Sequence, residues 1–460
     1  MIVALCFALA FIRWIEPLEA NLESVRHNET HFPGITGRGL IGDEVHYLPI
    51  AASVAKRAEY QLEPGKPTAV RVPGYPLYVA ALFSMFGRSV NVALAGNALL
   101  IAFLPLLAFL LAEPTFGRKT ATLAALLTAL NPGLYYFGVG AALSEPLFAV
   151  LICGATATWL RSRRENEPAF CRSDTGHDKL AAASTSVRAT GLARSEYTTL
   201  AFAVAAGILY GIASLTRTGY FGLPLFVMFL GMVFREHKWS LKQGIALCLA
   251  SGMVLSLWVA RNRAQIGAGL ISSTNDGVTL LCTALAAERH RGDCINPADA
   301  GPEFARVHEL PESVETNAAL RTMAISKLKK IPASTLVEVV AKRVFRLWVP
   351  LNRIVPDDVN SKANLAINVF YFPVVLLGVF GSWRARRKAL IVLTLALCSY
   401  MTLLAAVSWG GTRFRYAAEP FLAVLAAYGL MEIVRLHSLS SPYLNLVFKR
   451  KRPAHVIYET

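Results

Sequence analysis

Long apolar runs alternate with shorter polar segments along most of the chain. A helix needs roughly 20 apolar residues to cross a hydrocarbon core of about 30 Å, and runs of about that length recur many times. The pattern predicts an all-α integral membrane protein, a polytopic bundle of about 10–12 transmembrane helices. The expected spans lie near residues 1–15, 89–112, 119–140, 142–161, 199–216, 219–234, 243–260, 364–383, 389–408 and 417–435.

Two apolar runs are shorter than the rest. The first, Met1 to Ile15, has no basic segment before it and no small-residue cleavage site after it. This indicates an uncleaved helix or a truncated start rather than a signal peptide. Residues 75–87 are too short to span a bilayer unaided, so a re-entrant or interfacial helix and an additional crossing both stay open.

The composition agrees with a membrane protein. Hydrophobic residues make up 54% of the 460 positions, mean hydropathy is +0.45, and charged residues make up 17%, against roughly 25% in soluble domains. The net charge of +16 would suit nucleic acid, but the basic clusters directly follow apolar runs, as the positive-inside rule describes. We therefore expect a lipid bilayer as partner and no nucleic acid. The clusters are Arg161, Arg163 and Arg164; Arg235, His237 and Lys238; Arg384, Arg386, Arg387 and Lys388; and Lys449 to Arg452.

If these clusters are cytoplasmic, they orient the whole chain and put the two long polar segments, 16–74 and 261–363, on the outer face. The predicted inner linker, residues 162–198, is rich in Ser, Ala, Arg and Asp and lacks apolar periodicity, which is typical of a flexible segment. The expected parts are an N-terminal membrane module at 1–260 with a first outer loop at 16–74 and an inner linker at 162–198, an outer loop at 261–363, C-terminal transmembrane helices at 364–436 with an outer hairpin at 409–416, and a basic inner tail at 437–460.

The cysteines divide by position. Cys6, Cys153, Cys248 and Cys398 lie inside apolar runs and are most simply small core residues. Cys282 and Cys294 share one predicted outer loop. They could pair in an oxidising compartment, but two unpaired thiols fit the sequence equally well.

Two adjacent carboxylates, Asp43 and Glu44, stand in the first outer loop, with His46 and Tyr47 close behind. Acidic residues at this point would cap a helix that begins near Val45 and complement its dipole. A carboxylate held at the membrane surface could equally serve as a general base. The sequence leaves both interpretations open.

Further polar groups stand at the predicted outer ends of spans, where an ionisable residue costs several kcal/mol unless it is paired or functional. Each has a structural interpretation as a snorkelling, capping or anchoring residue. Each could also face a ligand, since outer arginines oppose the positive-inside rule and suit a lipid phosphate. The groups are Arg71 in "RVPGYPLYVAALF"; Glu145 in "SEPLF" with Arg217 in "SLTRTGY"; Arg261, Asn262 and Asn275 in "ARNRAQIGAGLISSTNDG"; and Arg413, Arg415 and Tyr416 in "TRFRYAAEP".

The order of these motifs resembles the GT-C membrane glycosyltransferases, in particular the protein mannosyltransferase and aminoarabinose transferase branch called glycosyltransferase family 39. The segments that carry the resemblance cover most of the chain. They are "GDEVHY", "RVPGYPLYVAALFSMFG", "FGRKTATLAALLTALNP", "LSEPLF", "GIASLTR", "ARNRAQIGAGLISSTNDG" and "RFRYAAEP".

The resemblance implies inverting transfer of a sugar from a polyprenyl-phosphate donor to a hydroxyl acceptor, at the outer face of a membrane such as the bacterial inner membrane. It implies that Asp43 accepts the acceptor's proton, with Glu44 as its companion. The residues implied to bind the donor phosphate are Arg413, Arg415, Arg71 and Arg261, and those implied to order the site are Tyr47, Glu145, Arg217, Asn262, Asn275 and Tyr416.

Cofactors are less determined. The sequence has no Gly-rich phosphate loop, no HExxH and no paired CxxC, so it gives no support for direct use of ATP or for a plainly written metal site. Some members of the resembled family use a divalent cation, for which Asp43, Glu44 and His46 are the available ligands here. The rival interpretations are a transporter or lipid-linked sugar flippase, which would bind near the bilayer midplane, and an inactive relative.

Overall fold

The computed structural model describes residues 30–164, 185–234, 240–349, 359–386 and 388–440, except positions 296, 298, 299, 302, 303, 305, 306, 308, 309 and 311. The expected first span at 1–15, most of the inner linker and the tail beyond residue 440 lie outside the described residues.

The described chain is helical apart from one small hairpin. Its elements are α3 (Glu44–Arg57), β1 (Gln61–Glu63), β2 (Lys66–Pro67), α4 (Gly74–Phe86), α5 (Val90–Phe116), α6 (Arg118–Ala129), α7 (Pro132–Val139), α8 (Glu145–Arg164), α9 (Thr185–Ser214), the 3-10 turn η2 (Tyr220–Gly222), α10 (Leu223–Val233), α11 (Leu241–Ile266), α12 (Asp276–Glu288), α13 (Val314–Lys330), α14 (Ala333–Trp348), α15 (Val359–Arg384), α16 (Ala389–Val407), the 3-10 turn η7 (Thr412–Ala418) and α17 (Glu419–Ser440).

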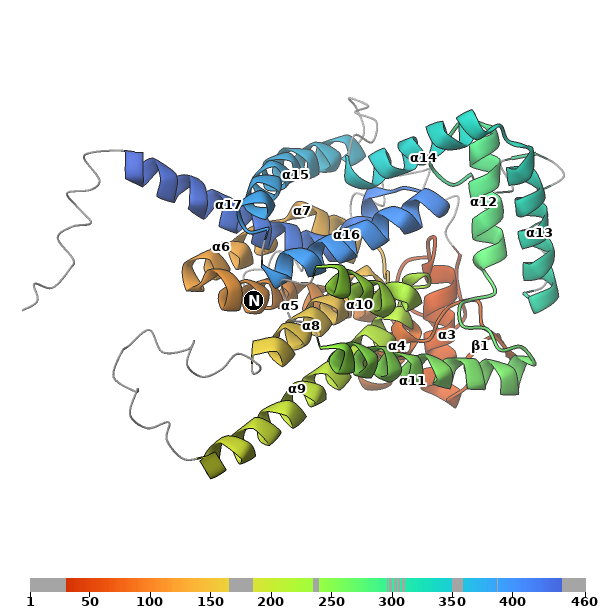
Figure 1. The fold of residues 1–460 in the computed structure, drawn as a ribbon. Coiled ribbons are helices and arrows are strands. Elements are labelled where there is room, and N and C mark those ends of the chain that lie inside the picture. Colours follow the sequence, from red (N-terminus) through yellow and green to blue (C-terminus); the bar gives the residue numbers. More distant parts are fainter. Residues whose placement is uncertain are drawn as a thin grey trace, which may run out of the picture.

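The long helices form the body of the molecule, and several shorter elements lie together at one end of it. Figure 1 shows α3, β1, α12 and α13 together at that end, although the chain between β1 and α12 runs through most of the body. Within the body, α9 packs against α8 and α11, and α15 packs against α17. Segments far apart in sequence therefore meet at one end of the bundle.

Small residues allow the helices to approach closely. A Cβ atom on Gly207 of α9 would collide with the carbonyl oxygen of Leu247 on α11, and one on Gly381 of α15 would collide with that of Leu425 on α17. Such contacts are typical of helix pairs in membranes, where close backbone approach rather than hydrophobic burial drives association.

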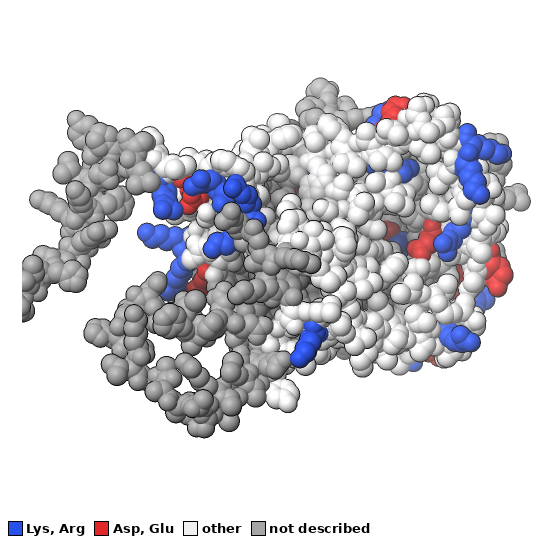
Figure 2. Space-filling model, viewed as in Figure 1, with Lys and Arg blue, Asp and Glu red and all other residues white. Residues whose placement is uncertain are grey.

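The described residues include six helices that are long and apolar enough to cross a membrane. They are Val90–Phe116, Tyr197–Ser214, Leu241–Ile266, Leu365–Arg384, Ala389–Val407 and Thr412–His437. Large apolar side chains on these helices stay exposed, among them Leu257 at 72% and Leu376 at 71%, which suits lipid contact rather than water. In Figure 2, charged side chains gather mainly at the two ends of the visible face, with a broad uncharged band between them. The protein is thus an all-α polytopic membrane protein, as the sequence predicts.

The expected single span at 119–140 is two helices, α6 and α7. The break falls at Asn131, whose side chain accepts a hydrogen bond from the Gly133 amide and caps α7, while Pro132 starts that helix. A proline lacks an amide proton and blocks the preceding turn, so it is favoured at a helix start and not inside one. The short apolar run at 75–87 forms α4, a helix of 13 residues.

Candidate active site

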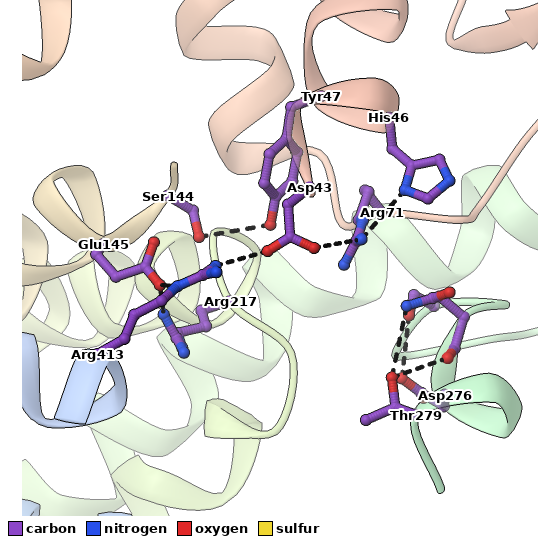
Figure 3. A network of polar contacts seen from close by, with 12 residues as sticks. Asp43, His46, Tyr47, Arg71, Ser144, Glu145, Arg217, Asp276, Thr279 and Arg413 are labelled. Atoms are coloured by element: carbon purple, nitrogen blue, oxygen red, sulfur yellow. Dashed lines mark hydrogen bonds and ion pairs between the residues drawn. The ribbon is translucent and has the colours of Figure 1, made fainter. Parts of the chain in front are cut away.

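Asp43 stands at the N-cap position of α3, but its side chain makes no capping hydrogen bond. Its two oxygens are instead taken by two guanidinium groups. Asp43 Oδ1 accepts from Arg71 Nη2 at 2.7 Å, and Asp43 Oδ2 accepts from Arg413 Nη2 at 2.6 Å. Asp43 therefore occupies the predicted N-cap position without capping the helix through its side chain, which is directed into a polar network (Figure 3).

The network continues from Arg413 to a second carboxylate. Arg413 Nε donates to Glu145 Oε1, and Arg217 Nη1 donates to the same oxygen at 2.7 Å. Glu145 is 1% exposed, so it is a buried anion held by two cations, the arrangement that makes a buried charge tolerable. The pairing of Glu145 with Arg217 is confirmed, and Arg413 joins this pair to Asp43.

Arg71 is also held by His46 and by an aromatic ring. Arg71 Nη2 lies 3.1 Å from His46 Nδ1, and since a guanidinium only donates, this ring nitrogen accepts. The guanidinium also stacks over Tyr47 at 5.2 Å from the ring centroid. His46 Nε2 lies 3.8 Å from Glu312 in the segment before α13, so several groups together orient Arg71.

Electrostatics keep Asp43 ionised. Burial would raise the pKa of its carboxyl, but the guanidinium groups of Arg71 and Arg413 and the hydrogen bond from Arg413 outweigh it and hold that pKa well below its usual value. In the protein as it stands, Asp43 is an anion with little tendency to accept a proton.

Several of the side chains in this network line a cavity of about 610 Å³, which has three kinds of wall. One wall is charged, and a second carries hydroxyl, amide, carboxylate and guanidinium groups from α12, the segment before it and α13. A third is apolar and comes mainly from α16 and the turns η2 and η7. Charged-wall residues are Asp43, Arg71, Arg217 and Arg413; polar-wall residues include Ser273, Asn275, Asp276, Thr279 and Arg321; apolar-wall residues include Tyr220, Phe221, Met401, Leu404, Val407 and Phe414. Figure 3 shows Asp276 and Thr279 on the side away from Glu145.

Glu44 is turned away from this cavity and is fully buried. Arg38 donates to both of its oxygens, at 2.8 and 2.9 Å, and the amides of Ile41 and Ala142 donate to them at 3.0 and 2.5 Å. These bonds join the segment before α3 and the start of that helix to the segment before α8. The structure therefore assigns the two adjacent carboxylates different environments, Asp43 in the cavity wall and Glu44 in the protein interior.

Arg415 and Arg261, expected beside the donor phosphate, do not line the cavity. Arg415 is 1% exposed, pairs with Glu419 at 2.7 Å and lies 3.5 Å above the ring of Tyr371. Arg261 donates to the carbonyl oxygens of Thr68 at 2.7 Å and Tyr60 at 2.8 Å, and so fastens the loop around the hairpin to α11.

The remaining expected residues divide in the same way. Tyr47 and Asn275 line the cavity. Asn262 is buried and donates to the Leu270 carbonyl at 2.9 Å, while Tyr416 is buried and donates to the Leu134 carbonyl at 2.9 Å. Both hold backbone segments behind the site.

The cavity also contains residues that the sequence did not single out, namely Asp276 and Arg321. Asp276 follows Asn275 directly, so the polar run "SSTNDG" carried a signal for it. Arg321 lies on α13, whose alternating polar and apolar positions look like those of any surface helix, and the sequence carried no signal for it.

The side-chain atoms available as metal ligands do not suit a divalent cation. Both Asp43 oxygens and the His46 Nδ1 atom already accept hydrogen bonds from guanidinium groups, and Glu44 faces elsewhere. Two arginines beside Asp43 would repel a dication. Among the described residues, no group of three His, Cys, Asp or Glu side chains could hold a metal ion.

No family model and no curated protein matches the sequence. Solved structures do match its fold. The oligosaccharyltransferase of Archaeoglobus fulgidus, crystallised with zinc and sulfate, is 15% identical, with a TM-score of 0.50 over 96% of this chain and 51% of its own. The same organism's AglB with an inhibitory peptide and dolichol-phosphate is 14% identical (TM-score 0.46; 99% and 52% covered), and ArnT of Cupriavidus metallidurans bound to undecaprenyl phosphate is 14% identical (TM-score 0.37; 94% and 78% covered).

These similarities concern the fold. The structural neighbours are GT-C glycosyltransferases, and this chain spans about half the length of the oligosaccharyltransferase. The narrower resemblance to family 39 stays a prediction.

Proposed function

We propose that this protein is a membrane glycosyltransferase that transfers a sugar, with inversion, from a polyprenyl-phosphate donor to a hydroxyl acceptor at the outer face of the membrane. The observation that carries the proposal is the position of Asp43, a carboxylate between two guanidinium groups in a cavity that also has an apolar wall. The GT-C fold of its neighbours supports the same reaction class. The bacterial inner membrane is the location that we propose.

The cavity suits both ends of such a donor. Its apolar wall includes Met401, Leu404 and Val407 of α16, a helix apolar enough to cross a membrane. Val407 is 72% exposed, so this wall continues toward the lipid-facing surface, where an isoprenoid chain can lie. Arg413 and Arg71 would then bind the phosphate, since guanidinium groups match phosphate oxygens in charge and geometry.

In the transfer step, Asp43 takes the proton of the acceptor hydroxyl while that oxygen attacks the anomeric carbon. The bond from this carbon to the phosphate oxygen breaks, and polyprenyl phosphate leaves with the negative charge. Arg413 and Arg71 stabilise the charge that develops on the phosphate. The polar wall, with Asn275, Asp276 and Thr279, offers hydrogen bonds to the sugar or the acceptor.

The same guanidinium groups link donor binding to the strength of the base. Without donor, Arg413 and Arg71 neutralise Asp43 and lower its pKa, and a general base works best when its pKa is near the working pH. A phosphate that takes hydrogen bonds from Arg413 removes part of that stabilisation, so Asp43 becomes more basic when the donor is present.

The experiment is a transfer assay with the purified protein in lipid nanodiscs. Polyprenyl-phosphate pentoses and hexoses are supplied with hydroxyl acceptors, and released polyprenyl phosphate and glycosylated acceptor are measured by mass spectrometry. We expect equal amounts of the two products. In proteoliposomes, movement of intact donor across the membrane without cleavage would instead establish the rival flippase function.

The transfer rate should not depend on a divalent cation, because the guanidinium groups of Arg71 and Arg413 occupy the Asp43 oxygens that a metal would need. We expect the rate in excess EDTA to stay within about twofold of the untreated rate, since loss of a catalytic metal would remove several kcal/mol of transition-state stabilisation. Loss of activity that added Mg²⁺, Mn²⁺, Ca²⁺ or Zn²⁺ restores would contradict this prediction.

A further inference from the structure

Cys282 and Cys294 meet at α12, the helix that supplies part of the polar wall of the cavity. Cys282 lies on α12 and Cys294 lies in the segment that follows this helix. Their thiols share a hydrogen bond, and the amide of Ile295 donates to the carbonyl of Cys282 at 3.3 Å. Two independent contacts, one between side chains and one between backbones, thus bring the two residues together.

The segment around Cys294 is connected to the site. The carbonyl of Gly292 accepts from the amide of Gly410 at 3.2 Å, and Gly410 stands three residues before Arg413. Beside Cys282, the carbonyl of Thr283 accepts from Arg343 at 3.2 Å. The thiol pair therefore lies close to two parts of the site. One is α12, which supplies polar-wall residues, and the other is the segment before Arg413, which Gly292 contacts.

We propose that Cys282 and Cys294 form an intramolecular disulfide that fastens the segment after α12 to that helix. The bond would close a short loop and hold Gly292 against Gly410. This proposal concerns a modification site and does not depend on the transfer function. It does require that the outer loop face an oxidising compartment, as the charge pattern predicts.

The chemistry is thiol–disulfide exchange with an oxidant that carries a disulfide, such as a protein disulfide oxidoreductase. The thiolate of one cysteine attacks the disulfide of the oxidant, forms a mixed disulfide and releases one thiol. The thiolate of the other cysteine then attacks the sulfur of the first and releases the second thiol of the oxidant, which has accepted two electrons.

The direct test is peptide mapping of protein taken from its native membrane, with free thiols trapped by N-ethylmaleimide during lysis. Trypsin cuts after Arg289 and Arg291 and separates the peptides 264–289 and 292–306, which carry one cysteine each. We expect a single linked species without reductant that gives the two peptides after reduction. Recovery of both peptides with N-ethylmaleimide on their cysteines would overturn the proposal.

A second measurement tests whether the bond holds this region together. We expect dithiothreitol to lower the melting temperature by roughly 5 °C, since a short closed loop limits the unfolded chain. A variant with both Cys282→Ala and Cys294→Ala should melt near the reduced value and not respond to dithiothreitol. Cys248→Ala, which alters a cysteine of α11, should keep the full response. An equal response in the double variant and the unmodified protein would contradict the proposed role.

Discussion

Asp43→Asn should lower the rate of sugar transfer by roughly 10²–10⁴-fold, because a positioned general base contributes about that much to a reaction. The same substitution should tighten the binding of polyprenyl phosphate. It removes the anion that competes with phosphate for Arg413 and Arg71, both of which contact Asp43 in the free protein. The measurements are kcat from released polyprenyl phosphate and Kd for that lipid, in the same nanodiscs.

A misfolded site would lower both the transfer rate and the affinity for polyprenyl phosphate. A lower rate with a higher affinity therefore indicates a lost base. Glu44→Gln is the matched control, since it neutralises the neighbouring carboxylate, which faces the interior and holds Arg38. We expect it to lower the melting temperature because removing one partner of a buried pair is destabilising. Its kcat per folded molecule and its Kd should stay unchanged. Full transfer activity in Asp43→Asn would rule out Asp43 as the base.

Arg413→Lys should lower kcat/KM by roughly 10²–10³-fold, as expected when a preorganised donor to the developing charge is lost. Arg413 contacts Asp43 through Nη2 and Glu145 through Nε at once. An ammonium group is a single point charge on a flexible stem, so it cannot hold both carboxylates in this planar geometry and still present a fork to phosphate. The measurement is the dependence of rate on donor concentration.

Arg415→Lys is the control for that prediction, two positions further along the same turn. Arg415 is buried against Glu419 and Tyr371, outside the cavity. The substitution should lower the free energy of unfolding by roughly 1–3 kcal/mol through lost hydrogen bonds and ring contact. The transfer rate of the folded fraction should not change. If Arg415→Lys impaired donor binding and Arg413→Lys did not, the assignment of these two arginines would have to be reversed.

Several features of the site were predictable because they depend on local sequence. Arg71, Glu145, Arg217 and Arg413 stand at ends of apolar segments, where an ionisable residue needs a partner or a function, and Asp43 stands in the predicted first outer loop. The predicted orientation puts these ends on one face, and the structure brings the five side chains into one network.

The sequence could not show which of two nearby residues with the same charge faces the cavity. Consecutive residues of a helix point about 100° apart, so Asp43 and Glu44 face different surroundings although they carry the same charge. Arg413 and Arg415 differ in the same way on a 3-10 turn, where positions two apart lie on different sides. Which member of each pair meets the cavity depends on the segments packed around it.

The sequence by itself determined that this is a helical membrane protein, and it predicted the outer face and most of the residues in the charged wall. Those conclusions rest on hydrophobic length and on the position of charge relative to it, which are properties of a few adjacent residues. Only the tertiary structure decided that Asp43 lies between Arg71 and Arg413, that Arg321 enters the cavity and that Cys282 meets Cys294. These contacts join segments that are separate along the chain, and their geometry is set by how the helices pack.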